Sequence, residues 1–291
     1  MQGILIVDKP QGWTSFDVVA KLRRVLGTRK IGHSGTLDPM ATGVLPVFAG
    51  QAARAVDMQA DHDKTYEATL LLGSRTDTGD ITGQVLESSP VTVGEKELLE
   101  VLPRFVGPQM QLPPMYSAVK INGQPLYKAA RQGKEVERQP RPVEIYSLRY
   151  LGQAGENEYR LEIACSKGTY VRVLLEEIGR AMGVPATMSA LRRTRAGIYG
   201  LEQSHPLEEI LRAGEEGRLE SWLLPVDTVF ERFSPVTVSP EIEKRLRNGA
   251  PTYKFRKPDG VYRLYTAEGF WGLGRVEDHV LRVEKSFCER E

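Results

Sequence analysis

Residues 32–39 read Gly-His-Ser-Gly-Thr-Leu-Asp-Pro and present one carboxylate, Asp38, on a glycine-rich segment. Glycines let loop backbone approach a ligand closely, and a carboxylate can act as a nucleophile or a general base. Aspartate before proline is also a common turn residue, and spacing alone favours that interpretation at about two to one. The segment does not fit G-x-x-x-x-G-K-[ST], which excludes a P-loop.

The overall charge limits what this carboxylate can serve. The chain has 291 residues, 41% hydrophobic and 26% charged, which is typical of a globular protein with one large and one small domain. A net charge of +1 excludes a uniformly basic surface, so any nucleic-acid site must be local.

The cysteines and histidines have no metal-binding or disulfide spacing. Cys165 and Cys288 lie far apart, and the four histidines are scattered. We therefore expect a reducing cytoplasm and no metal site. No signal peptide is expected at the N-terminus, and the longest uncharged run is shorter than the ~20 residues of a membrane-spanning helix.

The elements that must position Asp38 follow from periodicity and from turn residues. A helix is expected to start at an N-cap Ser15, to bury Phe16, Val19, Leu22 and Leu26, and to end at Gly27. The other predicted helices span residues 95–105, 125–132 and 169–182. The predicted strands span residues 3–7, 44–48, 64–72, 116–121 (followed by an Asn122-Gly123 turn), 143–151 and 158–164. This irregular order predicts an α+β fold with a mixed, mainly antiparallel sheet and flanking helices.

The chain changes character after about residue 230. Short β-like runs separated by glycine and proline predict a small β domain over residues 231–291, after a catalytic domain over residues 1–230.

Several motifs occur in an order that resembles one known family. They are Asp8-Lys9-Pro10-Gln11-Gly12, the Asp38 segment, Lys64-Thr65-Tyr66-Glu67, Arg75-Thr76-Asp77-Thr78, residues 114–120, residues 165–172 and Leu191-Arg192-Arg193. From about residue 3 to 229 the chain resembles the bacterial tRNA pseudouridine-55 synthase (TruB) family. Ser34 and Met40 depart from the family pattern, which commonly has Thr and Leu. The C-terminal segment is weakly similar to a PUA-type RNA-binding domain.

The resemblance implies that the chain isomerises uridine 55 in the tRNA T loop to pseudouridine without a cofactor. Asp38 would be the catalytic group, acting at C6 of the base or at C1′ of the sugar. Arg172 would hold Asp38 ionised, and Tyr66 would stack on a flipped uracil. Tyr170 and Leu191 would line the pocket, and His33 would contact the opened RNA loop.

Basic residues outside this pocket are expected to contact the RNA. The family pattern places a mobile insertion at about residues 120–145, which would clamp the T loop with Lys120, Arg131 and Arg141. Arg192, with Arg193 and Arg195, forms a second basic cluster with no nearby acid in the sequence. Lys9 is counted with the RNA-contact residues, although its position in the first motif favours structural support of the catalytic loop.

Two other functions fit the same residues. A base-releasing N-glycosidase also needs an aspartate near C1′, and an RNA-folding chaperone could open the tRNA elbow without chemistry. Replacing Asp38 with asparagine separates the chaperone from the synthase, and free uracil identifies the glycosidase. The protein is expected to act as a monomer, with no membrane partner.

Overall fold

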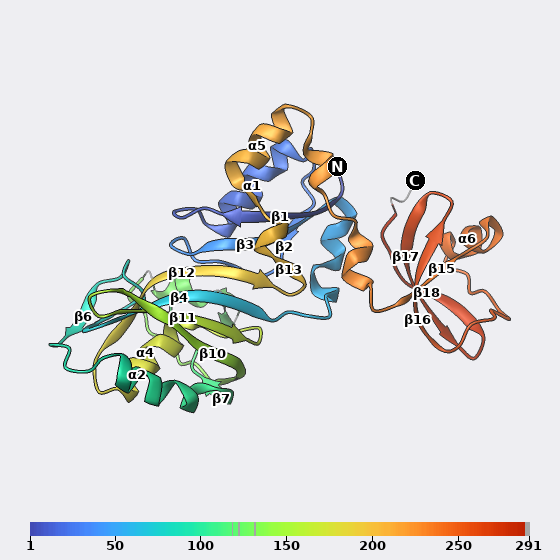
Figure 1. The fold of residues 1–291 in the computed structure, drawn as a ribbon. Helices are drawn as coiled ribbons and strands as arrows, with labels where there is room; N and C mark the ends of the chain where they lie inside the picture. The colour runs from blue at the N-terminus through green and yellow to red at the C-terminus, as the bar shows by residue number, and fades with distance from the viewer. Residues whose placement is uncertain (118, 122, 131, 289–291) are drawn as a thin grey trace.

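The computed structural model describes residues 1–117, 119–121, 123–130 and 132–288. A ten-stranded sheet forms the larger part, with the main order β14-β1-β3-β12-β4-β11-β10-β7; β2 pairs with β3, and β13 with β12 (Figure 1). These strands are β1 (Gly3–Lys9), β2 (Ile31–His33), β3 (Thr42–Ala49), β4 (Lys64–Leu72), β7 (Gly107–Gln111), β10 (Arg141–Gly155), β11 (Glu158–Cys165), β12 (Ala186–Ala196), β13 (Tyr199–Gly200) and β14 (His205–Pro206). All described pairs in this sheet are antiparallel except β1–β14 and β3–β12, which confirms the predicted mixed, mainly antiparallel α+β fold.

Strand β1 is buried on both faces because its hydrophobic residues follow one another without a polar interruption. Leu5 and Val7 belong to a core cluster that also contains residues of two helices, α1 (Ser15–Val25) and α5 (Leu207–Glu215). Ile4 and Ile6 point to the opposite face and join a second cluster. Successive side chains of a strand alternate between faces, so this run serves two cores. Figure 1 shows α1 and α5 together over one face of β1 and β3.

Helix α1 begins one residue earlier than predicted. Thr14 is its N-cap and forms a reciprocal capping box with Asp17. Ser15 is instead buried, and its hydroxyl accepts from the Leu37 amide at 2.9 Å and donates to the Leu37 carbonyl at 3.2 Å. The expected burial of Phe16 is also wrong, because its side chain is 65% exposed. The true N-cap frees Ser15 to tie α1 to the segment that carries Asp38.

Strand β12 is the main element that the sequence interpretation missed. Arg192, Arg193 and Arg195 interrupt its hydrophobic pattern, so it does not show the alternation of an ordinary strand. It nevertheless lies between β3 and β4 in the sheet. The predicted strand over residues 116–121 is also largely wrong: only β8 (Lys120–Ile121) forms, paired with β9 (Gln124–Pro125). Asn122, part of the predicted turn, lies outside the described residues.

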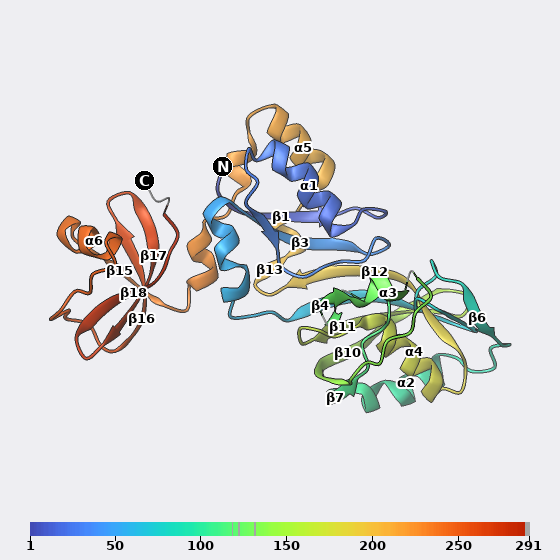
Figure 2. The same ribbon diagram turned by 180° about the vertical axis from the view of Figure 1, so that it is seen from behind.

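Helices cover the other end of the sheet. α4 (Val171–Ala181) packs on β12, and α2 (Glu95–Val101) lies near it; Figure 2 shows both beside β10 and β11. Gly179 permits the close contact of α4, because a Cβ there would lie 2.3 Å from the Cβ of Ala186. The predicted helix over residues 125–132 is the short α3 (Leu126–Ala130). The remaining elements of this part are β5 (Ser74–Thr76), β6 (Val85–Ser88) and the 3-10 helices at Gly50–Met58, Leu102–Phe105, Leu201–Gln203, Leu219–Trp222 and Val226–Phe230.

A separate four-stranded sheet follows, drawn in red in Figure 1. Its order is β15-β16-β17-β18, with strands Ser234–Thr237, Gly260–Thr266, Gly269–Glu277 and Val280–Ser286. The sequence interpretation missed its helix α6 (Pro240–Arg247), which Ser239 caps. Phe270 and Phe287 stack or pack against Phe230, so this sheet shares apolar contacts with the segment that precedes it. The domain boundary at residue 230 and the PUA-like assignment stay predictions.

Among the described residues, no helix is long and apolar enough to cross a membrane.

Candidate active site

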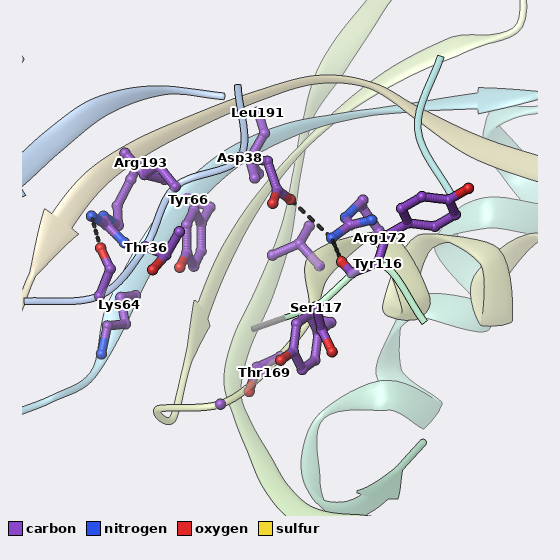
Figure 3. A pocket seen from close by; sticks show the side chains of 15 residues that line it. Thr36, Asp38, Lys64, Tyr66, Tyr116, Ser117, Thr169, Arg172, Leu191 and Arg193 are labelled. Carbon is purple, nitrogen blue, oxygen red and sulfur yellow. Dashed lines mark hydrogen bonds and ion pairs between the residues drawn. The ribbon is translucent and has the colours of Figure 1, made fainter. Parts of the chain in front are cut away.

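Five of the predicted site residues meet in one cavity of about 270 Å³. They come from distant parts of the chain and line the same space, as Figure 3 shows for four of them: Asp38, Tyr66, Arg172 and Leu191, with Tyr170 as the fifth. A cavity of this size is at the small end of ligand pockets, which suits one flat ring with polar edges.

Asp38 and Arg172 form an ion pair in this cavity. The Asp38 Oδ2 atom lies 3.0 Å from Nη2 of Arg172. The Arg172 side chain is only 5% exposed, whereas that of Asp38 is 37% exposed. The carboxylate therefore has one side held by the guanidinium and another open to the cavity, where a substrate can reach it.

Arg172 is itself fixed by groups behind it. Its Nη1 donates to the Thr78 carbonyl at 2.6 Å and its Nη2 to the Tyr116 carbonyl at 2.9 Å. The buried Asp80 places Oδ2 3.9 Å from Nη1, and its Oδ1 accepts from the Thr82 amide at 3.0 Å. These contacts orient the planar guanidinium, so the position of Asp38 follows from the rigidity of Arg172.

Burial and neighbouring charges act on Asp38 in opposite directions. Burial is the larger effect and raises the pKa of the Asp38 carboxyl, and the charge of Asp80 raises it further. Arg172 and, more weakly, Lys9 lower it. A reactive carboxylate in a partly dry site was expected to need a cationic partner, and the structure places Arg172 there.

Tyr66 lies on β4 directly opposite Arg193 on β12 in the strand register. Opposite residues of paired strands point to the same face, so both side chains reach the cavity. Tyr66 is 8% exposed, and burial raises the pKa of its hydroxyl while Arg193 opposes that rise. A neutral tyrosine ring in the cavity offers a surface on which a base can stack.

Tyr170 is placed by the edge strand β7. Its amide donates to Oε1 of the buried Gln111 at 2.7 Å, and Nε2 of Gln111 donates back to the Tyr170 carbonyl at 3.2 Å. Tyr170 is the N-cap of α4, two residues before Arg172. The same pair of hydrogen bonds therefore sets where α4 starts and where both cavity residues point.

The expectation that Lys9 contacts RNA is wrong, because this lysine supports the loop that carries Asp38. It is fully buried, and its Nζ donates to the carbonyls of Pro10 at 2.9 Å, Trp13 at 2.6 Å and Pro39 at 3.4 Å. No surface remains for RNA. Burial lowers the pKa of Lys9 to about 8. The lysine joins the first motif to the residue after Asp38, as the structural interpretation expected.

The remaining predicted RNA contacts lie outside the cavity. His33 is half-buried on β2, while Lys120 and Arg141 are exposed at β8 and at the start of β10. Arg131 lies outside the described residues. Each of the contacts with RNA predicted for these residues stays a prediction.

The three arginines of the second basic cluster have no acidic neighbour in the sequence, but two of them have one in the structure. Arg192 pairs with Asp8 at 2.7 Å, and Arg195 pairs with Asp61 at 2.9 Å, so two of its three members have acidic partners. Arg193 is 1% exposed and faces the cavity rather than the surface. The sequence did not reveal these partners because they lie more than a hundred residues away along the chain.

The cavity also contains groups that the sequence interpretation did not assign. Lys64, Thr169, Tyr116 and Ser117 line it, and the Ser117 Oγ atom is buried without a hydrogen-bond partner. Lys64 stood in the quoted motif beside Tyr66, so the motif already contained a signal for it. Asp80 gave no comparable signal, because its role depends on where Arg172 lies. Among the described residues, no cluster of acidic, histidine or cysteine side chains could hold a metal ion.

Comparisons with known proteins agree with this fold. The family described as TruB family pseudouridylate synthase, N-terminal domain, matches residues 23–171. The family described as tRNA pseudouridylate synthase B C-terminal domain matches residues 172–231. The matches define the class of protein as a pseudouridylate synthase.

Relatives and solved structures extend the likeness over nearly the whole chain. A tRNA pseudouridine synthase B from Dechloromonas aromatica is 45% identical over 94% of this chain and 91% of its own, and one from Clostridium perfringens is 38% identical over 99% and 100%. The chain belongs to the TruB family, which confirms the resemblance seen in the motifs. A chain in a crystal structure of a Cbf5-Nop10-Gar1 complex matches with a TM-score of 0.71 at 27% identity, covering 98% of this chain and 85% of that one.

Proposed function

We propose that this enzyme isomerises a uridine in the T loop of tRNA, at position 55, to pseudouridine, with Asp38 as the catalytic carboxylate. The observation that supports it most directly is the Asp38–Arg172 pair in a cavity lined by Tyr66 and Leu191. Family membership and the printed names of the relatives support the reaction and the tRNA substrate. The T loop and the role of each residue are our inference.

The reaction needs few groups because it gains and loses no atoms. The C1′–N1 bond breaks, the uracil turns while it is held, and C1′ bonds to C5. The proton on C5 then leaves, and N1 acquires one. Asp38 acts either by adding to C6 of the base or at C1′ of the sugar, and both routes use the open side of its carboxylate. The target base must first leave its stack, at a cost of a few kcal/mol.

Each of the other residues has a proposed part in the same step. Arg172 keeps Asp38 ionised and oriented, Tyr66 stacks on the uracil, and Tyr170 and Leu191 enclose it. His33 contacts the opened RNA loop, and Lys120, Arg131 and Arg141 clamp the T loop from the insertion. Arg192 pairs with Asp8, and we propose that the exposed part of its side chain contacts an RNA phosphate. We also propose that the protein acts as a monomer in the cytoplasm and that its C-terminal sheet binds RNA.

The decisive experiment maps pseudouridine in an unmodified tRNA transcript incubated with the protein. We expect one modified T-loop uridine, and we expect an isolated T-arm stem-loop to react while an unstructured oligomer of the same sequence reacts poorly, because folded RNA is recognised by shape and splayed bases. Equal rates on the stem-loop and the oligomer would contradict recognition of the folded loop. Free uracil among the products would favour the N-glycosidase.

The RNA-folding chaperone is tested with Asp38→Asn. A synthase with this change should still bind the T-arm but form no pseudouridine. A chaperone that only folds RNA should keep its folding activity. The two functions are separated by measuring the binding, the product and the folding of the tRNA on the same preparation.

A further inference from the structure

Two cations line the cavity on the side away from Arg172. Figure 3 shows Lys64 and Arg193 to one side of Tyr66, with Asp38 and Arg172 on the other. Among the described residues, neither Lys64 nor Arg193 has a carboxylate within ion-pair distance, whereas Arg172, Arg192 and Arg195 each have one. This side of the cavity therefore carries two cations that no described carboxylate pairs with.

The fold brings the two cations together at a glycine. Arg193 donates from Nε to the Val44 carbonyl at 2.7 Å and from Nη2 to the Gly35 carbonyl at 3.0 Å. Gly35 has a φ of +86°, and a Cβ there would lie 3.4 Å from Nη1 of Arg193 and 3.5 Å from Cε of Lys64. Backbone of the Asp38 segment thus lies against both side chains, and only glycine adopts this conformation without strain.

The nearest acidic residues have other partners. Asp61 pairs with Arg195 at 2.9 Å, and Asp63 accepts from the Tyr146 hydroxyl at 3.2 Å. Asp38 belongs to Arg172. Tyr66, opposite Arg193 in the strand register, stays neutral because burial raises the pKa of its hydroxyl. Asp61 and Asp63 therefore offset the charge of Lys64 only in part, and no described carboxylate lies within ion-pair distance of either cation.

Two cations that form no ion pair with a described carboxylate are costly to bury. Arg193 is 1% exposed, and Lys64 is half-buried, with its Nζ donating to the His62 carbonyl. Burial lowers the pKa of Lys64, and the charge of Arg193 lowers it further. Two like charges at one cavity wall repel each other, and a bound anion would relieve both the repulsion and the missing solvation.

We propose that Lys64 and Arg193, beside Gly35, bind a phosphodiester group that flanks the target uridine. The inference rests on the proposed function, because an RNA nucleotide in this cavity brings a phosphodiester with it. Arg193 lines the cavity as a donor that two main-chain carbonyls hold in place, and Lys64 is the second cation of the same wall, which would exchange the His62 carbonyl for the phosphate. Such a contact would hold the backbone on one side of Tyr66 while Asp38 reacts on the other.

The test uses the full-length protein and synthetic T-arm stem-loops in which one phosphate next to the target uridine, on either its 5′ or its 3′ side, is a neutral methylphosphonate. Single-turnover rates measured against protein concentration yield a half-saturating concentration and a maximal rate. We expect Lys64→Met to raise the half-saturating concentration about tenfold on the natural stem-loop. The slope of the logarithm of the binding constant against the logarithm of the salt concentration should become shallower by about 0.7–0.9, the value for one lost phosphate contact.

The decisive comparison is a double substitution cycle. One of the two methylphosphonates should weaken binding to the unchanged protein by a similar factor and should have almost no further effect on Lys64→Met, because the same contact is already absent. Lys64→Arg should recover most of the binding. Lys21→Met, which removes a lysine from the exposed side of α1, is the matched control and should respond fully to the methylphosphonate.

The inference would be overturned if, at both phosphates, the losses of binding caused by Lys64→Met and by the methylphosphonate simply added. Unchanged binding by Lys64→Met would overturn it as well. A stem-loop that the unchanged protein fails to convert would instead count against the proposed function. Circular dichroism melting of each variant is the accompanying check, and Lys64→Arg, with its charge retained, decides the inference if Lys64→Met melts early.

Discussion

The Nη2 atom of Arg172 lies 2.9 Å from the carbonyl oxygen of Tyr116 and 3.0 Å from Oδ2 of Asp38. One nitrogen thus joins the carboxylate of Asp38, the proposed catalytic group, to the backbone that leads into residues 120–145. A main-chain carbonyl can accept this bond from any residue type, so the connection depends on the path of the chain and not on the tyrosine side chain. Movement of this segment would therefore reach Asp38 through a single guanidinium.

Arg172→Ala should reduce turnover by at least about a hundredfold while leaving RNA binding nearly unchanged. Without the guanidinium, Asp38 loses the group that orients it and lowers its pKa, so less of it is ionised and correctly placed. Single-turnover rates and binding constants should be measured together. Arg180→Ala is the control on the same helix, since its exposed pair with Glu176 is worth little. Near-normal turnover by Arg172→Ala would contradict the proposed role.

Asp38→Asn should abolish pseudouridine formation, by roughly a thousandfold or more, because an amide is neither a nucleophile nor a base at this step. Binding of the T-arm should stay within about threefold of the unchanged protein, since phosphate contacts dominate affinity. The measurement is nucleoside analysis of the RNA after long incubation. Residual conversion at more than about a tenth of the normal rate would show that another group performs the chemistry.

The single-turnover rate should fall as the pH decreases through the pKa of Asp38. Since burial raises this pKa above the ordinary ~3.9, the loss should begin at a higher pH than for an exposed aspartate. The carboxyl contributes to stability in the opposite sense: the folded state binds the proton more tightly, so the free energy of unfolding gains from Asp38 as the pH falls towards ~3.9.

Arg172→Gln provides the comparison for that pH profile. Arg172 lowers the pKa of Asp38, so its neutral replacement should move the midpoint of the rate profile to still higher pH. Rates measured from about pH 5 to pH 8 on a stem-loop substrate would show the shift. A profile that moves to lower pH, or does not move, would mean that the titrating group is not this carboxyl.

Tyr66→Ala should weaken productive binding by about tenfold to a hundredfold, because base stacking is worth ~1–3 kcal/mol. Tyr66→Phe retains the ring and tests the hydroxyl separately. If the hydroxyl helps to remove the C5 proton, Tyr66→Phe should bind normally, react slowly and show a larger isotope effect with uridine deuterated at C5. Normal rates for Tyr66→Phe would limit this residue to stacking.

Lys9 should make the protein more stable as the pH rises. Its pKa is lowered to about 8 in the folded protein, against ~10.4 in the unfolded chain, so the unfolded state binds more protons between these values. The free energy of unfolding should therefore increase from about pH 8 to pH 10, and Lys9→Met should remove part of this increase. Urea unfolding at several pH values measures it, with Lys21→Met as the exposed control; identical slopes in all three proteins would contradict the burial of a charge at Lys9.

The local sequence was sufficient for the elements whose patterns are simple. The bounds of β4 were predicted without error, and those of α4 within two residues, because an apolar strand and a glycine-terminated helix are stabilised by their own residues and near neighbours. β12 was missed, because arginines inside a strand look like a surface segment until the sheet supplies their partners. For Arg192 and Arg195 these partners are Asp8 and Asp61.

The sequence by itself determined the family, the α+β class and five of the residues that meet in the cavity, because ordered motifs preserve residue types together with their spacing. It did not determine the surroundings of each charge. Only the tertiary structure decided that Lys9 is buried, that Arg172 lies between Asp38 and Asp80, and that Lys64 and Arg193 form no ion pair with a described carboxylate. The physical reason is that burial and ion pairing depend on distances between residues far apart in the chain, and these distances exist only after the sheet has formed. Spacing alone made Asp38 look like a turn residue, and the ordered motifs made it a candidate catalyst; the tertiary structure added its surroundings, with Arg172 of α4 at 3.0 Å.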